Sequence, residues 1–341
     1  MKALVLVDGP KLILEERLIP KPKAGEIVIK VLRSAICQTD FHAIHGTYPI
    51  KLPVVLGHEF SGEIFDKDKN IDYFNIGDRV VSAGIIGCGF CSLCRDGIPH
   101  YCKMSKEIGF TYDGGWQEYV AIPSQNIYKI PNAISFDEGA LLEPLDCALG
   151  ALNKARIIPG DDFLIIGSGP GGLLMTQLAK IFGARNIFLA GRREERLKLA
   201  KDFGANEIID ISKESLRDSV MEKTNNKGVE ISIDAVGTGK TIKDALELVV
   251  PEGYVVLYGV GDGHEKTFET DIIPLKMLSI VGDQSSHRSW SRSIKLVESK
   301  MIDVKSLITH HFTLNEFDKA LSYAEKRTDG AIKVMFDINN Y

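Results

Sequence analysis

Four of the six cysteines in this chain of 341 residues lie close together, in the segment GCGFCSLCRDGIPHYC. Their spacing is C-x2-C-x2-C-x7-C, at Cys88, Cys91, Cys94 and Cys102. Thiolates this close in sequence can converge on one tetrahedral ion, a geometry that zinc favours. The glycines and Pro99 around them predict a tight lobe rather than a helix or strand. Because all four thiols serve as ligands, the sequence predicts a structural zinc site with no free position for a substrate.

Disulfides are the alternative interpretation of the same four cysteines. The N-terminal stretch MKALVLVDGPKLILEERLIP turns polar after seven residues, so it lacks the apolar core of a secretory signal. No run approaches the ~18 apolar residues of a membrane-spanning helix. Since cytosolic thiols stay reduced, we expect zinc-bound thiols, no membrane association and a cytoplasmic location.

Composition and charge limit the class of protein to which this chain can belong. Hydrophobic residues make up 44% of the chain and charged residues 26%, a balance typical of soluble proteins. This length is enough for roughly two domains. The formal net charge is -5, and no domain has the basic excess that nucleic-acid binding requires. We therefore expect no nucleic-acid partner.

The pattern of the chain changes along its length. Residues 1–150 contain short β-rich runs such as EIVIKVLRSAIC and DRVVSAG, which predict a mostly antiparallel, barrel-like domain. Residues 151–289 alternate strand-like runs (FLIIG, NIFLAGR, ISIDAV, YVVLYGV, LSIVGD) with helical ones such as TIKDALELVV. A helix is also expected over residues 139–155. This alternation predicts an α/β fold with a doubly wound parallel sheet. Residues 290–341 begin with a helix and end in the strand KVMFDI, and we expect them to pack on the first domain.

The segment GSGPGG, which begins at Gly167, matches the G-x-G-x-x-G pattern of dinucleotide-binding sites. It follows the apolar run FLIIG and opens a helix, which is the context that the pattern requires. Gly167 permits the tight turn, Gly169 lets the backbone approach a pyrophosphate, and Gly172 allows close packing of the helix on the strand. The helix start at Pro170 and Gly171 offers N–H donors to the anion. A glycine loop without a ligand is the alternative.

The end of the next expected strand distinguishes between two cofactors. An NAD site usually has an acid there, about 20 residues past the glycines, to bind the ribose 2′-hydroxyl. In NIFLAGRREERL this place is taken by Gly191, followed by Arg192 and Arg193. Two guanidinium groups offer paired donors to a 2′-phosphate. The sequence therefore favours NADP(H) over NAD(H). The alternative, that the arginines only cap a helix start, is disfavoured because a helix N-terminus disfavours cations.

A second set of metal-ligand types is dispersed along the chain. Cys37 lies in SAICQTDFH, His58 and Glu59 lie in GHEF, and Glu143 lies in LLEPLDCALG. A thiolate and an imidazole are good zinc ligands, and a carboxylate can complete the set. Each is a weak signal alone, because a single Cys or His is more often a buried core residue. Their presence beside the cysteine lobe and the dinucleotide motif favours a second, catalytic zinc site.

Together these motifs resemble the zinc-dependent medium-chain alcohol dehydrogenases over essentially the full chain. The matching residues are GHE at Gly57–Glu59, the cysteine lobe, EPL at Glu143–Leu145 and GSGPGG. Because Glu143 stands where many members have cysteine, the chain is similar to the polyol (sorbitol) dehydrogenase branch, which includes threonine and sugar dehydrogenases. The resemblance implies a GroES-like, β-barrel-type catalytic domain with its zinc lobe at 85–105, a Rossmann domain, and a homodimer or homotetramer.

The resemblance also implies a role for each site residue. Cys37 and His58 are zinc ligands, and Glu59 and Glu143 bind the metal directly or through water. Asp40 orients His58, and Thr39 and His42 relay the alcohol proton to solvent. Zinc lowers the pKa of the substrate hydroxyl, and the nicotinamide accepts a hydride from the same carbon.

The resemblance is weaker for the residues that would contact the substrate. Sorbitol dehydrogenases have an aromatic–Arg–aromatic segment where this chain has Gln284, Ser285 and Ser286, with Arg288 nearby as a substitute. Tyr48 and Phe110 are further candidates for the pocket. We expect a polyol or sugar; threonine, a simple secondary alcohol and a phosphorylated polyol are alternatives. A remote alternative is a protein that binds zinc and nucleotide but does not catalyse a reaction.

Overall fold

The computed structural model describes residues 1–261, 268–283 and 289–339, and the chain in it divides into two compact units. The first unit contains Met1–Glu143 together with Trp290–Tyr341, and the second contains Pro144–Ser289. The border therefore lies inside helix α4 (Leu142–Lys154), earlier than the expected border at residue 150.

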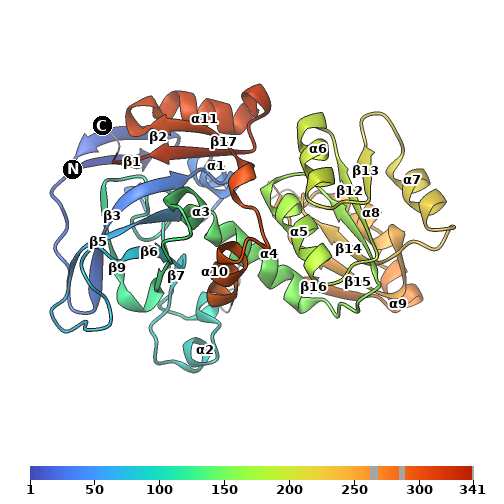
Figure 1. Ribbon diagram of the computed structural model, residues 1–341, viewed down its shortest axis with the longest axis horizontal. Coiled ribbons are helices and arrows are strands. Elements are labelled where there is room, and N and C mark those ends of the chain that lie inside the picture. The colour runs from blue at the N-terminus through green and yellow to red at the C-terminus, as the bar shows by residue number, and fades with distance from the viewer. Residues whose placement is uncertain (262–267, 284–288, 340–341) are drawn as a thin grey trace. The chain divides into compact units, whose positions relative to one another are not determined.

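The first unit is built mainly from β-strands (Figure 1). Within the described residues its central sheet has the order β10-β6-β5-β3-β18-β17, with β9 also paired to β3. Neighbours are antiparallel except β17 and β18. The strands are β3 (Glu26–Ala35), β5 (Glu59–Lys67), β6 (Arg79–Ser82), β9 (Tyr119–Pro123), β10 (Ile127–Lys129), β17 (Ile308–Thr313) and β18 (Lys333–Asp337). This confirms the mostly antiparallel domain predicted from the sequence.

Two smaller sheets and several helices complete the first unit. The sheets are β1 (Lys2–Asp8), β2 (Lys11–Glu16) and β4 (Val54–Val55), and β7 (Ile85–Ile86) with β8 (Lys106–Glu107). The helices are α1 (Gln38–Ile44), α2 (Ser92–Arg95), α3 (Phe136–Ala140), α10 (Trp290–Glu298) and α11 (Phe317–Lys326). Short 3-10 turns are η1 (Pro99–Tyr101), η2 (Ser124–Asn126), η3 (Lys305–Leu307), η4 (Leu314–Glu316) and η5 (Thr328–Gly330).

The C-terminal strand β18 lies inside the central sheet, between β3 and β17. It is antiparallel to β3, with Met335 opposite Ala35. Its residues Val334, Met335 and Phe336 are buried, as expected for an apolar run between two neighbouring strands. In Figure 1 this strand, near the red end of the colour scale, joins strands from the blue, N-terminal part of the chain. The first unit is therefore completed by a strand that follows the second unit in the sequence.

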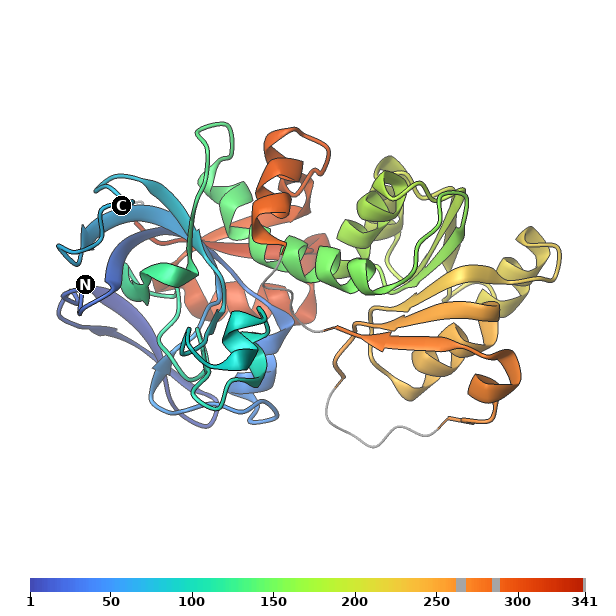
Figure 2. The same cartoon turned by 90° about the horizontal axis from the view of Figure 1, so that it is seen from below.

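The second unit is a parallel sheet covered by helices. Within the described residues the strand order is β13-β12-β11-β14-β15-β16, and every neighbouring pair is parallel. Helices α5 and α6 contact each other over β12, and α7, α8 and α9 form a second contiguous set, so both faces are covered (Figures 1 and 2). This confirms the doubly wound fold. The strands are β11 (Asp162–Ile166), β12 (Asn186–Gly191), β13 (Glu207–Asp210), β14 (Val229–Asp234), β15 (Val249–Leu257) and β16 (Ser279–Gly282). The helices are α5 (Pro170–Ile181), α6 (Glu194–Asp202), α7 (Leu216–Lys223), α8 (Gly239–Leu248) and α9 (Ile272–Lys276).

Several local expectations differ from the structure. The helix expected over residues 139–155 is divided, because α3 ends at Ala140 and α4 begins at Leu142. The last two valines of TIKDALELVV belong to β15, as β-branched residues favour strands. Strand β13 and helix α7 were not expected, and the zinc lobe contains one helical turn, α2.

None of the helices in the described part of the chain combines the length and the apolar character needed to cross a bilayer.

Candidate active site

Cys37 stands where strand β3 gives way to helix α1. It is the N-cap residue of α1, and its backbone N–H donates to Asp40 Oδ2 at 2.8 Å. Such a contact satisfies a donor that the helix start would otherwise leave unpaired. The thiol of Cys37 is therefore held at a fixed point, at the end of a central strand of the first unit.

His58 and Glu59 reach the same place through a tight glycine turn. Gly57 has a φ of +90°, and a Cβ there would lie 2.2 Å from the ring of Trp116. Only glycine adopts this backbone readily and fits against the indole. Strand β5 then begins at Glu59, opposite Ala35 of β3, so the turn delivers both side chains beside Cys37.

These three residues form a group suited to a metal ion. The donor atoms of Cys37, His58 and Glu59 all lie within 4.8 Å of one another. His58 and Glu59 are buried, at 8% and 1% exposure, and Cys37 is half-buried. A thiolate, an imidazole and a carboxylate are a recognised donor set for zinc. The residues fit the metal, although their assignment as ligands stays a prediction.

Glu143 lies near this group but outside it. It occupies the first turn of α4, and its charge acts on Lys333 in the same part of the first unit. It does not belong to the set of donor atoms within 4.8 Å of one another, as far as the described residues show. The choice between Glu59 and Glu143 as the direct ligand therefore stays open.

A buried lysine accompanies the group, and the sequence analysis did not single it out. Lys333, at the start of β18, donates to both carboxylate oxygens of Glu59 and to the backbone oxygen of Ile36. It is 3% exposed. Burial lowers the pKa of Lys333, but the negative charges of Glu59 and Cys37 outweigh this and raise it. The sequence did contain a sign of this role, because a single cation within an apolar strand must have a buried partner.

Asp40 links the thiol and the imidazole. Its Oδ1 lies 3.5 Å from His58 Nδ1, and neither atom has a hydrogen-bond partner among the described residues. Nδ1 therefore faces Asp40, which leaves Nε2 as the donor for a metal. Burial lowers the pKa of His58, but the charges of Asp40 and Cys37 outweigh it and hold the pKa well above its ordinary value. The negative charge of this buried site favours a bound cation.

The expected relay residues lie on α1. Thr39 Oγ1 is 3.6 Å from Cys37 Sγ, so its hydroxyl is next to the predicted ligands. His42 Nδ1 is 3.3 Å from Thr47 Oγ1, which is exposed. No hydrogen bond within the described residues joins Thr39 to His42. The two groups are on one short helix without forming a continuous relay.

The cysteine lobe brings its four thiols together. The sulfurs of Cys88, Cys91, Cys94 and Cys102 lie within 4.8 Å of one another, and Cys88 and Cys94 are 3.9 Å apart. Tetrahedral zinc with Zn–S bonds near 2.3 Å requires sulfurs about 3.8 Å apart, whereas a disulfide requires about 2.05 Å. None of the six cysteines, all of them within the described residues, forms a disulfide. The geometry fits a zinc ion and not the disulfide alternative.

Backbone donors in the lobe are directed at sulfur. Cys91 N donates to Cys88 Sγ at 3.4 Å, and Met104 N donates to Cys102 Sγ at 3.4 Å. The backbone N–H of Phe90, with that of Cys91, lowers the pKa of Cys88 to about 6. The thiolate form that zinc requires is therefore favoured at this position.

The glycine motif in the second unit has the expected geometry. Gly167 has a φ of +119°, and a Cβ at Gly172 would lie 1.9 Å from the backbone oxygen of Gly167. A Cβ at Gly169 would meet no atom within 4 Å. The space beside Gly169, at the N-terminus of α5, is therefore open where a pyrophosphate would approach. Gly171 lies against Tyr258, so Pro170 and Gly171 begin the helix close to this space.

The two arginines follow strand β12 directly. Gly191 is the last residue of β12, and a Cβ there would lie 2.4 Å from Ser168 Oγ, which belongs to the glycine loop. Arg193 is the N-cap residue of α6, and Arg192 is exposed. No carboxylate occupies Gly191, Arg192 or Arg193. Both arginine residues therefore follow directly after the strand next to β11, whose last residue, Gly191, lies against the glycine loop.

The substrate candidates lie partly within the described residues. The rings of Tyr48 and Phe110 contact each other at an interplanar angle of 53°, with centroids 4.8 Å apart, and the ring of Phe110 is 5.1 Å from that of His58. Tyr48 also donates to Glu107, which the sequence analysis did not single out. Arg288 and its neighbours at 284–287 lie outside the described residues.

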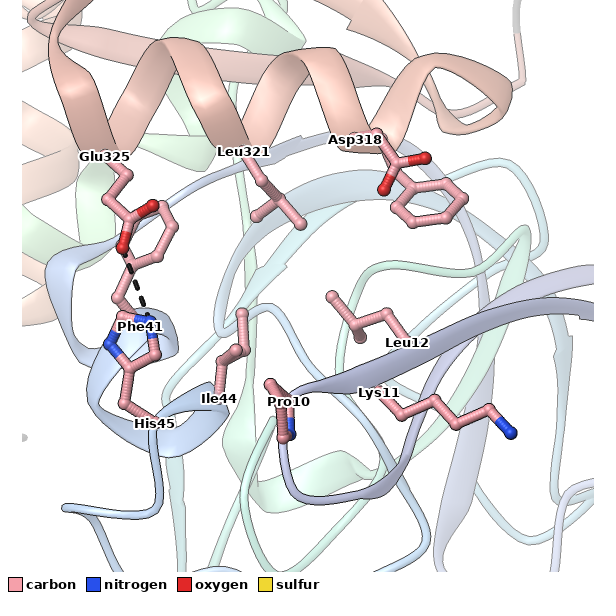
Figure 3. Close-up of a pocket in the computed structure, with 10 residues that line it drawn as sticks. Pro10, Lys11, Leu12, Phe41, Ile44, His45, Asp318, Leu321 and Glu325 are labelled. Carbon is pink, nitrogen blue, oxygen red and sulfur yellow. Dashed lines mark ion pairs between the residues drawn. The ribbon is translucent and has the colours of Figure 1, made fainter.

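A cavity of about 330 Å³ in the first unit is separate from these residues (Figure 3). Pro10, Leu12, Phe41, Ile44 and Leu321 supply apolar lining, and a 3.4 Å ion pair joins His45 and Glu325 at its edge. None of the predicted metal ligands lines it.

Comparison with known proteins identifies the family. Residues 23–132 match the model of the alcohol dehydrogenase GroES-like domain, and residues 170–299 match that of the zinc-binding dehydrogenases. The sorbitol dehydrogenase of Halalkalibacterium halodurans is 33% identical over 98% of each chain. This chain belongs to the zinc-dependent medium-chain alcohol dehydrogenase family.

Other relatives show the range of this dehydrogenase family. An L-threonine 3-dehydrogenase of Shewanella is 30% identical over 98% of this chain and 97% of its own. A protein described as a zinc-binding dehydrogenase from Sinorhizobium meliloti, bound to NADP, has a TM-score of 0.93 at 29% identity over 98% of both chains. An alcohol dehydrogenase from Escherichia coli, complexed with NADH, has a TM-score of 0.92 at 31% identity over 99% of both chains. The dehydrogenase is thus an oxidoreductase that acts on CH–OH groups, and its relatives bind both forms of the cofactor.

Proposed function

We propose that this dehydrogenase transfers a hydride between NADP(H) and a secondary hydroxyl or carbonyl group of a polyol or sugar, with zinc as its catalytic metal. The observation that carries the proposal is the buried group of Cys37, His58 and Glu59, whose donor atoms lie within 4.8 Å of one another. The similarity to a sorbitol dehydrogenase supports a polyol as substrate. A cytoplasmic location, without a nucleic-acid or membrane partner, is part of the proposal.

The residues of the first unit have distinct tasks in this mechanism. Cys37 and His58 hold the metal, and Glu59 or Glu143 completes the set directly or through water. When bound, zinc draws electron density from the substrate hydroxyl and makes its proton easier to remove. Asp40 keeps Nδ1 of His58 facing away from the metal.

The proton leaves through groups on α1. The hydroxyl of Thr39 lies beside Cys37 Sγ and can accept the proton of the substrate hydroxyl. His42 lies one turn further along α1, with the exposed Thr47 beside it, and can pass a proton to solvent. Because no hydrogen bond joins Thr39 to His42 in the described residues, we expect the substrate or a water molecule to complete the relay.

The second unit holds the cofactor, which supplies or accepts the hydride. The backbone at Gly169 leaves room for the pyrophosphate at the N-terminus of α5, while Gly167 forms the turn and Gly172 lets the helix pack closely. Arg192 and Arg193 stand where an NAD-specific site has an acid, and can bind a 2′-phosphate.

A chelator and a substrate panel test the reaction. Zinc is removed with a chelator and oxidation of polyols, aldoses, simple secondary alcohols and threonine is measured with NADP and with NAD. We expect polyol or sugar oxidation that stops on zinc removal and returns when zinc is added. An undiminished rate without metal would refute the mechanism, and no activity on any substrate would favour a non-catalytic protein.

The cofactor preference is tested separately. Replacing Arg192 and Arg193 by alanine should weaken NADPH binding and leave NADH binding little changed, as measured by fluorescence titration. The matched control is Arg156→Ala, which removes a cation from the second unit outside the motif. Equal losses for both cofactors would count against a 2′-phosphate role.

Threonine is the second candidate substrate, because an L-threonine 3-dehydrogenase is 30% identical over nearly the whole chain. The substrate panel separates it from polyols. We also propose a homodimer or homotetramer, which light scattering coupled to size-exclusion chromatography would test.

A further inference from the structure

Glu107 is a half-buried carboxylate of the first unit, bound to the substrate candidate Tyr48. It ends the short strand β8, and the N–H groups of Phe110, Thr111 and Tyr112 all donate to its backbone oxygen, at 3.1, 2.9 and 3.0 Å. Thr111 Oγ1 accepts from the backbone N–H of Glu107 at 2.7 Å. This tight turn fixes Glu107 relative to Phe110.

Tyr48 binds the side chain of Glu107. Its hydroxyl lies 2.9 Å from Oε1 and 3.1 Å from Oε2 of Glu107. One O–H group is thus shared between two oxygens that together have about four acceptor positions. In the described part of the chain no other group donates to this carboxylate. Glu107 is half-buried and retains capacity for further donors.

The same residues connect Glu107 with the predicted metal site. The ring of Phe110 lies between Tyr48 and His58, with centroids 4.8 and 5.1 Å away. Burial raises the pKa of Glu107, whereas the hydrogen bond from Tyr48 and the charge of His58 oppose that rise. His58 is thus close enough to act on Glu107 electrostatically. Tyr48 thus contacts both Glu107 and Phe110, and Phe110 contacts His58 of the predicted metal group.

We propose that Glu107 is a specificity-determining residue, whose carboxylate accepts hydrogen bonds from hydroxyl groups of the substrate other than the reacting one. The inference rests on the proposed function and narrows its substrate class to uncharged polyols and sugars. A carboxylate accepts from hydroxyl donors and repels anions, so phosphorylated polyols are disfavoured. A simple secondary alcohol has no second hydroxyl to offer and gains nothing from Glu107.

The test compares three substrates: sorbitol, 2-butanol and sorbitol 6-phosphate. The wild type, Glu107→Gln and Glu107→Asp are measured with each substrate, and Glu16→Gln is the matched control because Glu16 is exposed on β2. The Gln variant removes the charge at nearly constant side-chain shape. The Asp variant keeps the charge, but its shorter side chain moves the carboxylate away from the substrate. Zinc content and melting temperature of every variant are measured alongside, to separate loss of metal or folding from a change in selectivity.

We expect Glu107→Gln to raise KM for sorbitol about tenfold, which corresponds to loss of a hydrogen bond to a charged group. Its kcat/KM for 2-butanol should fall much less than that for sorbitol, and its kcat/KM for sorbitol 6-phosphate relative to sorbitol should rise. Glu107→Asp should raise KM for sorbitol without gaining activity on sorbitol 6-phosphate. This variant provides the test if the Gln variant does not fold. Glu16→Gln should match the wild type throughout.

Two outcomes would overturn the inference about Glu107 and leave the proposed function in place. The first is that the ratio of kcat/KM for sorbitol to kcat/KM for 2-butanol is unchanged in both Glu107 variants. The second is an equal loss of activity on all three substrates with normal zinc content. A wild type that oxidises 2-butanol as efficiently as sorbitol also overturns it. A wild type inactive on every substrate of the panel would instead remove the proposed function, and the inference with it.

Discussion

Lys333 and Glu59 form a buried ion pair within the predicted catalytic site. Strand β3 separates the two strands that carry them, and both side chains come together at the end of β3, where Cys37 follows. Removing water from two charges costs free energy, which their attraction and hydrogen bonds offset only while both partners are present. We interpret Lys333 as the residue that holds the carboxylate of Glu59 in place beside the predicted metal ligands.

The first prediction concerns this pair. Lys333→Met removes the cation at similar volume and leaves Glu59 buried without compensation, so the free energy of unfolding should fall by about 3–5 kcal/mol. Urea denaturation followed by circular dichroism measures the change. Glu59→Gln combined with Lys333→Met should recover part of the loss, because the uncompensated charge is then absent. Strictly additive losses would contradict a direct coupling between the two residues.

Residue motifs predicted the site only in part. Cys37, His58 and Glu59 could be singled out because their types and neighbouring residues are typical of metal ligands, and the structure brings them together. The pair of Glu59 and Lys333 joins positions 274 residues apart, and such long-range contacts are not visible in local patterns. Nothing in the sequence pointed to Glu107, because a carboxylate in a short polar segment is ordinary until its partner Tyr48 is known.

At the scale of elements, glycine has two different roles at the junction of β11 and α5. A Cβ at Gly172 would collide with the backbone oxygen of Gly167, whereas a Cβ at Gly169 would enter open space. Gly172 is therefore required by packing, and Gly169 is required only if a ligand occupies that space.

The second prediction compares two variants at this junction. Gly172→Ala should lower the free energy of unfolding by about 1–3 kcal/mol, since the helix must move away from the strand. Gly169→Ala should keep the wild-type stability but weaken cofactor binding. Thermal denaturation and nucleotide titration measure the two effects. Normal cofactor affinity in Gly169→Ala would show that the pyrophosphate does not approach this position.

The cysteine lobe is an element held together by its ligands rather than by a core. Apart from Cys102, its cysteines are only half-buried, and its helix α2 has four residues. Phe90, Tyr101 and Met104 are exposed. So small and exposed a segment has little apolar surface to bury, and metal binding must supply much of its stability.

The third prediction follows for the lobe. Cys94→Ser should reduce the zinc content by one ion per chain and lower the melting temperature. The control, Cys147→Ser, alters a buried thiol outside both ligand groups and should leave zinc content unchanged. Atomic emission measures the metal. Full zinc content in Cys94→Ser would exclude the four-cysteine site.

At the scale of the whole molecule, both predicted metal sites belong to the first unit. The second unit has its own apolar core around Leu164, Phe188 and Val255. Loss of zinc should therefore loosen one unit and leave the other intact.

The fourth prediction tests this division. Treatment with a chelator should increase hydrogen exchange at the cysteine lobe and around Cys37 and His58, and not in strands β11 to β15. Mass spectrometry of peptides measures the exchange, and added zinc should restore protection. Uniform loss of protection in both units would contradict independent stability.

The overall architecture was largely predictable from the sequence, for physical reasons. The alternation of apolar strands with helices after residue 160 specifies a parallel sheet with few alternatives. Strand β13 escaped notice because it is only four residues long, and the division of α3 from α4 lies within one helical pattern. The border between units falls inside α4, so no change of composition marks it.

The place of β18 bears on the biosynthesis of the enzyme. The ribosome emits the second unit complete, but the central sheet of the first lacks its interior strand until residues 333–337 emerge. Lys333 is thus translated only after the whole second unit, and a nascent polypeptide that terminates before it cannot form the pair with Glu59. A chain released before β18 cannot close the central sheet of the first unit, so we expect proteases to recognise it although its second unit can already fold.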